Sequence, residues 1–512
     1  MNPVTVTRST PHLTIPSVEA LELPPLGKLQ PFAMVPRRVH LFGAGGAGVS
    51  GAARLLVEHG HVVSGHDRAP SDHVELLRTL GVAVEVDPSN AKLAPADTEL
   101  VVRSAAIPLD DPRVRDAEAR GLTVLKYAEL LRRVTPERRT LAVAGTHGKT
   151  TTSWFLFHAL AALANEFRAS QPRPGALVGG ICRRLGQNAT SAAEGGWFSI
   201  EACEYDRSFL QLSPFGAAIT NVEADHLDYY GTFDAIKGAF AHFADRLPFE
   251  GLLVVGQEVP RLVEEAARCK VWRFGRDVTV KLRGERMGRF AFDLAGPGFE
   301  VAGVELSIPG AFNVENAGLA LALAVGTAAA HGGVDLSAAA RAAARGLAGY
   351  AGAKRRFETW FESDGITVVH DYAHHPTEVR VTLEAARRAL PGRPLHVLFQ
   401  PHQHSRTARF FDDFVEALRF ADRVVVADVY GARAHIDGEH SAGASELAQA
   451  LLAAKVNAVW GGKLSASVKR FVEALPADCA ALVMGAGDVE DIKDELQNEL
   501  AVRGTRQRGS RR

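Results

Sequence analysis

The chain has 512 residues, of which 46% are hydrophobic and 23% are charged, and its formal net charge is -1. This composition is typical of a soluble globular protein and excludes a disordered chain, and no run approaches the ~18 apolar residues that a membrane helix needs. The near-neutral charge gives no basis for a nucleic-acid partner. The four cysteines lack CxxC spacing and the first 36 residues lack a signal-peptide pattern, so we expect a cytoplasmic protein with reduced thiols and no membrane contact.

The length predicts about three domains of roughly 100–200 residues each. Residues 1–36 mix Pro, Thr and Leu without sustained periodicity, so we expect a flexible leader there. After it, β-like runs alternate with Ala/Leu-rich helical runs in three series, which start at Arg38, at Thr140 and near Lys354. This alternation indicates parallel sheets with helical crossovers. We therefore predict an α/β fold with three domains, over residues 37–137, 138–346 and 347–512.

A glycine-rich turn, GAGGAG over residues 43–48, follows the first predicted strand and opens a helix. Glycines allow the backbone to approach a diphosphate, and the helix N-terminus presents free N–H groups to it. Asp67, at the end of the next strand, has the spacing of an acceptor for a ribose hydroxyl. Alone, this Rossmann-like pattern fits an NAD-dependent dehydrogenase as well as any other diphosphate ligand, and a purely structural tight turn is a further alternative.

A second glycine-rich turn, AGTHGKTTT over residues 144–152, also lies between a strand and a helix. Its Gly148-Lys149-Thr150 matches the end of a phosphate-binding loop, in which the lysine neutralises phosphate charge and the threonine hydroxyl ligates Mg²⁺. Val143 replaces the usual first glycine, so the loop is either a variant or a chance match. Two phosphate loops argue against a simple dehydrogenase. They predict ATP on a P-loop-type central domain and a nucleotide-like substrate on the first turn.

Carboxylates and a histidine follow two later apolar strands. Glu201 and Glu204 end the strand WFSIE, and TNVEADH after GAAI carries Asp225 and His226. Strand C-termini of open parallel sheets face the ligand crevice, so these groups could complete the coordination of Mg²⁺ bound to ATP. The alternative is that they are helix caps and solvated strand ends.

Seven motifs carry a family resemblance, and they stand in this order: AGTHGKTTT, EACEYDRSFL, TNVEADHLDYYG, GAFNVENA, AKRRFE, DYAHHPTEV and FQPHQHSRT. The set resembles the Mur ligases of peptidoglycan synthesis, and the similarity runs from about Arg38 to Gly487. The resemblance implies a Rossmann-like first domain for the UDP part of UDP-N-acetylmuramate, a central ATP-binding domain, and a Rossmann-like third domain for an amino acid. Closure of the domains would assemble the site.

The resemblance also implies roles for individual residues. Lys149 and Arg356 would contact the ATP phosphates, and His374 would lie near the reacting amine as the best candidate for its base. Thr150 and Glu201 would hold one Mg²⁺ and His226 a second. The implied ATP-binding residues are Gly145, Thr146, His147, Gly148, Lys149, Thr150, Thr151, Asn313, Asn316, Arg355, Arg356 and Asp371. The implied UDP-sugar residues are Gly45, Gly46, Ala47, Gly48, Ser50, Asp67 and Ser104, and the implied amino-acid residues are Tyr372, His374, His402 and Arg406.

Plainer interpretations of some of these residues stay open. Asn313 in GAFNVENA could be only a helix N-cap, and the arginine pair 355–356 could be a solvated linker. The adjacent histidines 374 and 375 could suggest a metal site, although consecutive residues rarely ligate one ion together.

Within the family, the residues favour the members that add L-alanine. Sister ligases that act later use a carbamylated lysine downstream of the DH motif, and here Lys237 is too close to His226 for that spacing. The segments QLSP and FQPHQHSRT favour the alanine enzymes over a recycling ligase that attaches a tripeptide to the same nucleotide sugar. Two positions depart from the alanine pattern: Gln403 stands where many members have arginine, and Cys203 replaces a common aspartate.

The expected reaction is ATP-dependent phosphorylation of the lactyl carboxylate of UDP-N-acetylmuramate, followed by attack of the L-alanine amine on the acyl phosphate. ATP and Mg²⁺ are the expected cofactors, and we expect a monomer or a weak homodimer. A nucleotide-binding regulator without ligase activity is an alternative from another class, but it would need degraded third-domain motifs. A dehydrogenase is the third choice.

Overall fold

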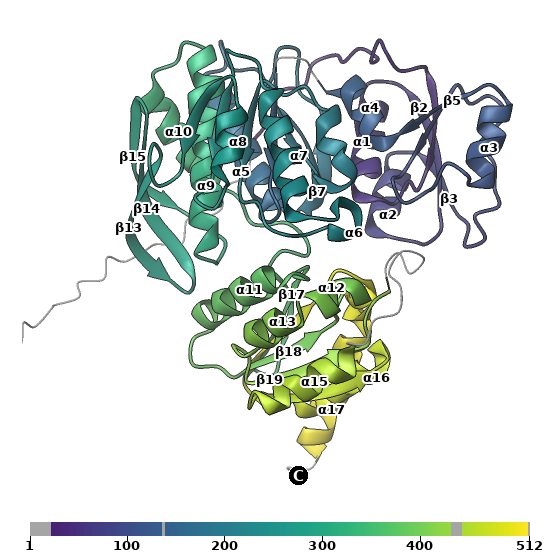
Figure 1. Cartoon of the computed structure of the whole chain (residues 1–512), viewed down its shortest axis with the longest axis vertical. Coiled ribbons are helices and arrows are strands. Elements are labelled where there is room, and N and C mark those ends of the chain that lie inside the picture. Colours follow the sequence, from purple (N-terminus) through teal and green to yellow (C-terminus); the bar gives the residue numbers. More distant parts are fainter. Residues whose placement is uncertain (1–21, 136–138, 432–442, 510–512) are drawn as a thin grey trace, which may run out of the picture.

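The computed structural model describes residues 22–135, 139–431 and 443–509. Over these residues the chain forms three α/β domains, which confirms the expected fold class. Figure 1 shows the C-terminal domain, coloured green to yellow, lying below the N-terminal and central domains. Residues 1–21 of the expected leader lie outside the described residues, so its flexibility there stays a prediction.

The N-terminal domain is built on a parallel five-stranded sheet in the order β3-β2-β1-β4-β5. The chain continues to one side of β1 through β2 and returns on the other side as β4, so a crevice opens at the carboxyl ends of β1 and β4. The first glycine-rich turn lies at this crevice. The strands are β1 (Arg38–Phe42), β2 (Val62–Asp67), β3 (Ala83–Val86), β4 (Leu100–Arg103) and β5 (Thr123–Lys126), and the helices are α1 (Ala47–Glu58), α2 (Asp72–Thr79), α3 (Pro112–Ala119) and α4 (Tyr127–Val134).

The central domain has a seven-stranded sheet in the order β12-β11-β10-β6-β9-β7-β8, in which only the β7–β8 pair is antiparallel. Because β6 lies between β9 and β10, the loops that follow these three strands meet at one edge. The strands are β6 (Thr140–Ala144), β7 (Gly175–Cys182), β8 (Gln187–Thr190), β9 (Phe198–Glu201), β10 (Gly216–Ile219), β11 (Leu252–Val255) and β12 (Lys270–Arg273). The helices are α5 (Lys149–Glu166), α6 (Leu227–Tyr230), α7 (Phe233–Asp245), α8 (Arg261–Ala266), α9 (Phe312–Leu323) and α10 (Leu336–Ala348), with a 3₁₀ turn over Tyr205–Gln211 and a π-helical stretch over Ala324–Ala329.

A three-stranded antiparallel sheet, in the order β13-β14-β15, belongs to the central domain and had no counterpart in the predicted alternation. Phe290, Phe292 and Leu294 stand at alternate positions of the middle strand and join the core formed with α5, α9 and α10. The three strands follow one another without a helix between them, so they do not fit the strand–helix alternation on which the prediction rested. The strands are β13 (Thr279–Arg286), β14 (Arg289–Gly296) and β15 (Phe299–Glu305).

The C-terminal domain has a six-stranded sheet in the order β16-β17-β21-β18-β19-β20, parallel except for the β16–β17 pair. The loops after β17 and β18 leave the same edge of this sheet, and they carry the predicted amino-acid residues. The strands are β16 (Glu358–Ser363), β17 (Ile366–Asp371), β18 (Leu395–Phe399), β19 (Arg423–Ala427), β20 (Asn457–Gly462) and β21 (Cys479–Met484). The helices are α11 (Pro376–Ala389), α12 (His404–Arg409), α13 (Phe411–Leu418), α15 (Ala444–Ala453), α16 (Leu464–Ala474) and α17 (Lys493–Gly509), with a 3₁₀ turn over Asp488–Ile492.

Residues 22–36, which belong to the expected leader, make defined contacts with two domains. The Phe32 ring stacks on His59 with centroids 3.9 Å apart, and the Phe32 N–H donates to His61 Nε2 at 3.0 Å. Arg173 of the central domain donates to the Pro24 carbonyl at 3.3 Å. This segment therefore links the N-terminal and central domains.

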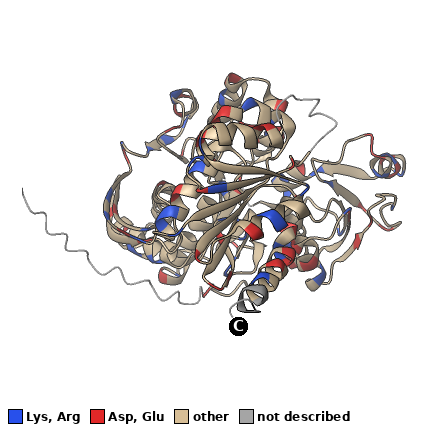
Figure 2. Ribbon diagram, turned by 90° about the horizontal axis from the view of Figure 1, so that it is seen from below, with Lys and Arg blue, Asp and Glu red and all other residues tan. Residues whose placement is uncertain are grey.

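The surface carries charges of both signs. Figure 2 shows Lys and Arg interspersed with Asp and Glu over helices and loops. In the described part of the chain, no helix is both long and apolar enough to cross a membrane.

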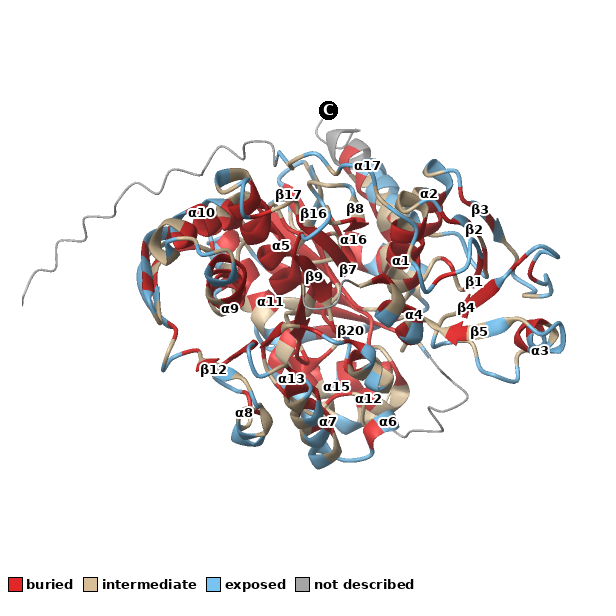
Figure 3. Ribbon diagram, turned by 90° about the horizontal axis from the view of Figure 1, so that it is seen from above, coloured by how far each residue is buried: buried red, intermediate tan, exposed pale blue. Residues whose placement is uncertain are grey.

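The core of the central domain contains a histidine that does not belong to the candidate site. His158 lies on α5, which Figure 3 shows among the buried elements, and its exposed fraction is 0%. Its Nδ1 donates to the Trp154 carbonyl at 2.8 Å. Burial lowers the pKa of His158 from 6.5 to about 4. Between pH 6.5 and about pH 4, His158 is protonated in the unfolded chain but neutral in the folded chain. Its contribution to the free energy of unfolding is therefore fully present above pH 6.5 and is lost as the pH falls toward 4.

We expect this histidine to lower the free energy of unfolding of the central domain by roughly 3 kcal/mol between pH 7 and pH 4. His158→Asn keeps a donor for the Trp154 carbonyl but does not titrate, so it should flatten that part of the stability profile. Urea denaturation at a series of pH values measures the effect, and His242→Gln on the exposed surface of α7 is the control. A His158→Asn profile as steep as that of the unmodified protein would contradict the prediction.

Candidate active site

The first glycine-rich turn is a tight loop whose shape depends on close contacts. The Gly45 N–H donates to Asp67 Oδ2 at 2.7 Å. A Cβ on Gly48 would lie 2.6 Å from the Tyr127 ring, so only glycine fits there. Asp67, predicted to accept from a ribose hydroxyl, thus accepts from the loop backbone. The structure brings all the predicted UDP-sugar residues around this loop: Gly45, Gly46, Ala47, Gly48, Ser50, Asp67 and Ser104.

A cavity of about 630 Å³ lies near this loop, between the N-terminal and C-terminal domains. Its lining includes Ser71 and His73 from one side and Arg355 from the other. His73 Nδ1 is 3.1 Å from Ser50 Oγ, so the cavity adjoins the predicted UDP-sugar residues.

The second glycine-rich turn wraps around the start of α5. Gly145 and Gly148 have φ values of 138° and 80°, in the region that favours glycine. A Cβ on Gly145 would lie 1.9 Å from the Thr220 hydroxyl. The His147 N–H donates to Asn221 Oδ1 at 2.8 Å, and the Thr220 hydroxyl donates to the His147 carbonyl at 2.6 Å. The segment after β10 therefore fixes the backbone of the phosphate loop.

Lys149, the first residue of α5, is anchored at the mouth of this loop. Its Nζ donates to the Gly145 carbonyl at 2.6 Å and lies 2.9 Å from Glu204 Oε2. Burial works against the charge, but the Glu204 carboxylate outweighs it and the pKa of Lys149 is raised. Lys149 therefore carries its positive charge throughout the neutral range.

The predicted metal ligands lie beside Lys149. The Thr150 hydroxyl donates to Glu201 Oε2 at 3.0 Å, and the Gly179 N–H donates to the same oxygen at 2.8 Å. His226 Nε2 is 3.9 Å from Glu204 Oε1 and 3.8 Å from Asp225 Oδ2. Thr150 and Glu201 are thus in direct contact, and His226 joins the group through the Glu204 carboxylate.

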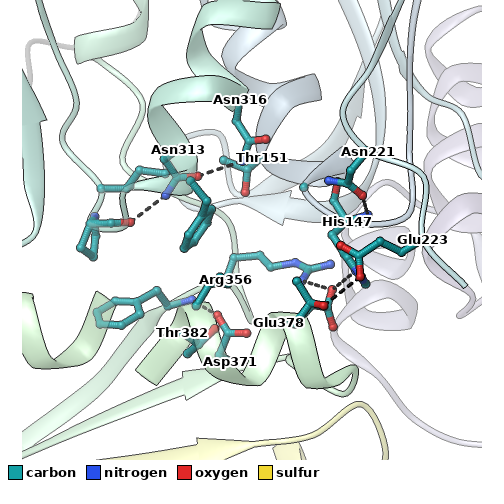
Figure 4. Close-up of a pocket in the computed structure, with 17 residues that line it drawn as sticks. His147, Thr151, Asn221, Glu223, Asn313, Asn316, Arg356, Asp371, Glu378 and Thr382 are labelled. Atoms are coloured by element: carbon teal, nitrogen blue, oxygen red, sulfur yellow. Dashed lines mark hydrogen bonds and ion pairs between the residues drawn. The ribbon is translucent and has the colours of Figure 1, made fainter. Parts of the chain in front are cut away.

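Figure 4 shows a cavity between the central and C-terminal domains, with a volume of about 140 Å³. Asn313 and Asn316 on α9 lie at one side of it, next to Thr151 of α5. The Asn316 amide donates to Asn313 Oδ1 at 3.2 Å, and the Asn313 amide donates to the Pro309 carbonyl at 2.7 Å. Ala311 is the N-cap of α9, so the alternative that Asn313 is an N-cap is wrong.

The C-terminal domain supplies a cation and a carboxylate to this cavity. Arg356 Nη1 lies 3.6 Å from Glu378 Oε1, and its guanidinium faces the Tyr372 ring at 5.5 Å. Asp371 accepts from the Phe357 and Ala373 N–H groups at 2.7 and 2.8 Å, and burial raises its pKa to about 6. Arg355, in contrast, pairs with Glu490 at 3.2 Å at the border of the 630 Å³ cavity.

His147 lies between carboxylates from both domains. Its Nδ1 is 3.2 Å from Glu378 Oε1, and its Nε2 is 3.6 Å from Glu223 Oε2. Burial opposes a charge here, but the two carboxylates outweigh it and raise the pKa of His147 to about 9. Figure 4 shows His147, Glu223, Glu378 and Arg356 together on the side of the cavity away from Asn313 and Asn316.

The predicted amino-acid residues form a second group at the edge of the C-terminal sheet. The rings of His374 and His402 are 5.5 Å apart, and those of His374 and Tyr372 are 5.3 Å apart. Arg406 Nη1 lies 3.0 Å from His402 Nδ1. The structure thus brings Tyr372, His374, His402 and Arg406 together.

Arg406 also forms a buried ion pair across the domain boundary. Its Nη2 lies 2.7 Å from Asp225 Oδ1, and the two side chains are 5% and 8% exposed. Burial disfavours the charge of Asp225, but the guanidinium outweighs it and holds the pKa of Asp225 well below its usual value. Arg406, which is expected to bind the carboxylate of a substrate, is therefore paired with the carboxylate of Asp225 in this structure.

The two departures from the alanine pattern lie at different depths. Gln403 is buried just before α12, with φ 68°, and its N–H donates to the Tyr430 carbonyl at 2.9 Å. Cys203 is exposed and stands between Glu201 and Glu204.

Sequence reasoning gave no site role to Asn221 or Glu378, placed Glu223 only within the acidic motif after GAAI, and set His375 aside as a metal ligand. Asn221 fixes the phosphate loop within the central domain, and the other three lie where the central and C-terminal domains meet. A local signal existed for Glu378 alone, because it stands three residues after the N-cap His375 and its carboxylate accepts from the His375 N–H at 3.4 Å, as in a capping box. The other three act through contacts between residues that are far apart in the chain.

Three α/β domains around a phosphate loop, with acidic and basic groups from two domains at its mouth, define a multidomain P-loop-type nucleotide-binding protein. Sequence matches make this class more specific: residues 38–139 match the family described as "Mur ligase family, catalytic domain", residues 143–324 match "Mur ligase middle domain", and residues 355–487 match "Mur ligase, glutamate ligase domain". The chain belongs to the Mur ligase family, which confirms the resemblance seen in its motifs.

Individual relatives are similar over nearly the whole chain. A UDP-N-acetylmuramate--L-alanine ligase from Kineococcus radiotolerans is 40% identical over 481 residues, which cover 91% of this chain and 97% of that protein. One from Acidithiobacillus ferrooxidans is 37% identical over 475 residues, with coverages of 89% and 96%.

Solved structures share the three-domain fold. The UDP-N-acetylmuramate-alanine ligase MurC from Thermotoga maritima has a TM-score of 0.73 and 25% identity, covering 91% of this chain and 99% of that chain. A murein peptide ligase from Psychrobacter arcticus has a TM-score of 0.66 and 24% identity, with the same coverages. At this identity the similarity shows only that the fold is shared.

Proposed function

We propose that this Mur ligase joins L-alanine to UDP-N-acetylmuramate with conversion of ATP to ADP and phosphate, in the synthesis of peptidoglycan precursors. The observation that carries the proposal is the 40% identity, over 91% of this chain, to a relative that bears this activity in its name. The Lys149–Glu204 ion pair and the Thr150–Glu201 hydrogen bond at the phosphate loop support it. Its proposed location is the cytoplasm, where ATP is available.

Phosphoryl transfer needs concentrated positive charge more than covalent chemistry. Lys149 at the phosphate loop and Arg356, which lines the 140 Å³ cavity, supply that charge. Asn313 and Asn316 are placed to bind the adenine end of ATP, since both line the same cavity away from the cations. The lactyl carboxylate of the sugar nucleotide attacks the γ-phosphorus, ADP leaves, and an acyl phosphate forms.

Mg²⁺ fits the Thr150–Glu201 pair, because a hydroxyl and a carboxylate 3.0 Å apart are hard oxygen donors of the kind it prefers. When bound, Mg²⁺ neutralises phosphate charge. We assign His226 to a second ion on the strength of the resemblance and of its place beside Glu204 and Asp225.

In the second half-reaction, the amine of L-alanine attacks the acyl carbon and phosphate leaves. Arg406 and His402 orient the amino acid, with Arg406 binding its carboxylate. Because a guanidinium can only donate, His402 Nδ1 must accept from Arg406, which makes Nε2 the donor nitrogen of a neutral His402. The His374 ring contacts the ring of His402, and His374 is our candidate to take the proton from the ammonium group of L-alanine.

Amino-acid specificity tests the proposal directly. Purified protein with UDP-N-acetylmuramate, ATP and one amino acid at a time should release phosphate most efficiently with L-alanine. Glycine and L-serine serve as close competitors. Phosphate release without any amino acid, or only with a tripeptide, would overturn the assignment, and the second result would identify the recycling ligase instead.

A further inference from the structure

Two ring nitrogens on opposite sides of a domain boundary are buried without a hydrogen-bond partner. They are Nε2 of His147, on the phosphate loop, and Nε2 of His375, at the start of α11. The rings are 4.7 Å apart, and the His375 side chain is 6% exposed. Burying a polar nitrogen without a hydrogen bond is unfavourable. His147 Nε2 faces the Glu223 carboxylate at 3.6 Å, beyond hydrogen-bond distance, and His375 Nε2 has no hydrogen-bond partner.

A carboxylate completes this group. Glu223 Oε2 lies 3.6 Å from His147 Nε2 and 3.9 Å from His375 Nδ1. Because His375 Nδ1 accepts from the Thr377 N–H at 3.4 Å, Nε2 is the nitrogen of His375 whose lone pair is left for an ion. Ligand atoms of the three residues all lie within 4.8 Å of one another. In a tetrahedral zinc site with bonds of about 2.0–2.1 Å, neighbouring ligand atoms are roughly 3.3 Å apart, so small side-chain rotations would close the group around one ion.

We propose that His147, Glu223 and His375 form a binding site for a zinc-class transition-metal ion that joins the central and C-terminal domains. This site is separate from the proposed Mg²⁺ position at Thr150 and Glu201. Two imidazoles and one carboxylate suit zinc, whereas Mg²⁺ prefers oxygen donors. The inference stands independently of the proposed ligase function.

The surroundings of His147 have the arrangement that zinc ligands use. Its Nδ1 lies 3.2 Å from Glu378 Oε1, so that carboxylate fixes the ring and leaves Nε2 toward the site. The Thr377 hydroxyl donates to Glu223 Oε2 at 2.8 Å and orients the carboxylate. The carboxylates of Glu223 and Glu378 make the electrostatic potential at this site negative. A bound cation would replace the proton on His147 Nε2.

An ion can reach this position from the surface. Glu223 and His375 line a cavity of about 440 Å³, whereas Glu223 and His147 line the 140 Å³ cavity. The three ligands thus stand between the two cavities, and the fourth coordination position faces one of them. The adjacent histidines 374 and 375 have different neighbours. His375 faces His147, whereas His374 contacts Glu378 and His402.

The test is zinc binding to the full chain without nucleotide or sugar substrate, measured by competition with a chromophoric chelator in excess Mg²⁺. We expect one tight Zn²⁺ per chain. His375→Asn keeps an N-cap side chain for α11 but removes the imidazole, and it should weaken binding by more than about 100-fold, as should Glu223→Gln. Glu378→Gln should weaken it by about 10- to 100-fold, the usual effect of a residue that orients a ligand.

Matched controls separate this site from its neighbours. His242→Gln, on the exposed surface of α7, and Glu201→Gln, at the proposed Mg²⁺ position, should retain the affinity of the unmodified protein. X-ray absorption of the zinc complex should show two imidazoles. Absence of a stoichiometric zinc, an unchanged affinity in His375→Asn, or a loss caused by Glu201→Gln would each overturn the proposal. A failed ligase assay would leave these results untouched.

Discussion

Lys149→Met is expected to lower the rate of ATP-dependent phosphate release by about 10³-fold, the effect typical of removing one preorganised charge from the site of a developing oxyanion. The variant keeps the length of the side chain but loses the ammonium that lies 2.6 Å from the Gly145 carbonyl at the mouth of the phosphate loop. It also leaves the buried carboxylate of Glu204 without the cation 2.9 Å away, so some loss of thermal stability accompanies the loss of rate.

Two measurements distinguish a role of Lys149 in phosphoryl transfer from a role in the overall stability of the protein. Acyl-phosphate formation should disappear, whereas binding of UDP-N-acetylmuramate, measured by calorimetry, should be nearly unchanged because its loop lies in the N-terminal domain. Lys237→Met on α7 is the matched control and should keep full activity. If sugar binding vanished with Lys149→Met, the division of labour between the first two domains would be wrong.

Arg406→Lys should raise the KM for L-alanine on the order of 10²-fold, because a lysine cannot reproduce the planar fork of donors that a carboxylate binds. The KM values for ATP and for UDP-N-acetylmuramate should change little. The guanidinium is 5% exposed and lies 2.7 Å from Asp225, so Arg406→Met would in addition leave Asp225 buried and unpaired.

The conservative variant therefore gives the cleaner experiment. Steady-state kinetics with each substrate varied in turn separates the KM effect from a loss of kcat. Arg409→Lys, on the exposed side of the same helix α12, is the control and should behave as the unmodified protein. An equal fall in activity at saturating and limiting L-alanine would argue that Arg406 does not bind the amino acid.

The sequence predicted those parts of the site that local patterns encode. The phosphate loop and the carboxylates that follow β9 were predicted from a strand, a loop and a helix in order. The structure pairs Lys149 with Glu204 and Thr150 with Glu201. The parallel sheets followed from the alternation of apolar runs, because a parallel strand needs a crossover.

Contacts between distant residues escaped the sequence analysis. Asp225 and Arg406 are 181 positions apart, and the sequence places each in a motif without indicating that they pair. His147 and Glu378 meet for the same reason, since only the docking of the C-terminal domain brings α11 to the phosphate loop. The antiparallel sheet β13–β15 was missed because its strands follow one another without the intervening helices that the predicted alternation requires.

The Asp225–Arg406 pair gives the proposed alanine subsite a thermodynamic property. Asp225 belongs to the central domain and Arg406 to the C-terminal domain, so the guanidinium is held in place only while the two domains are together. Occupancy of the subsite and the docked arrangement of the domains are then linked equilibria. Under the proposed function, any ligand that favours docking, ATP included, raises the affinity for L-alanine by the same factor by which L-alanine raises the affinity for that ligand.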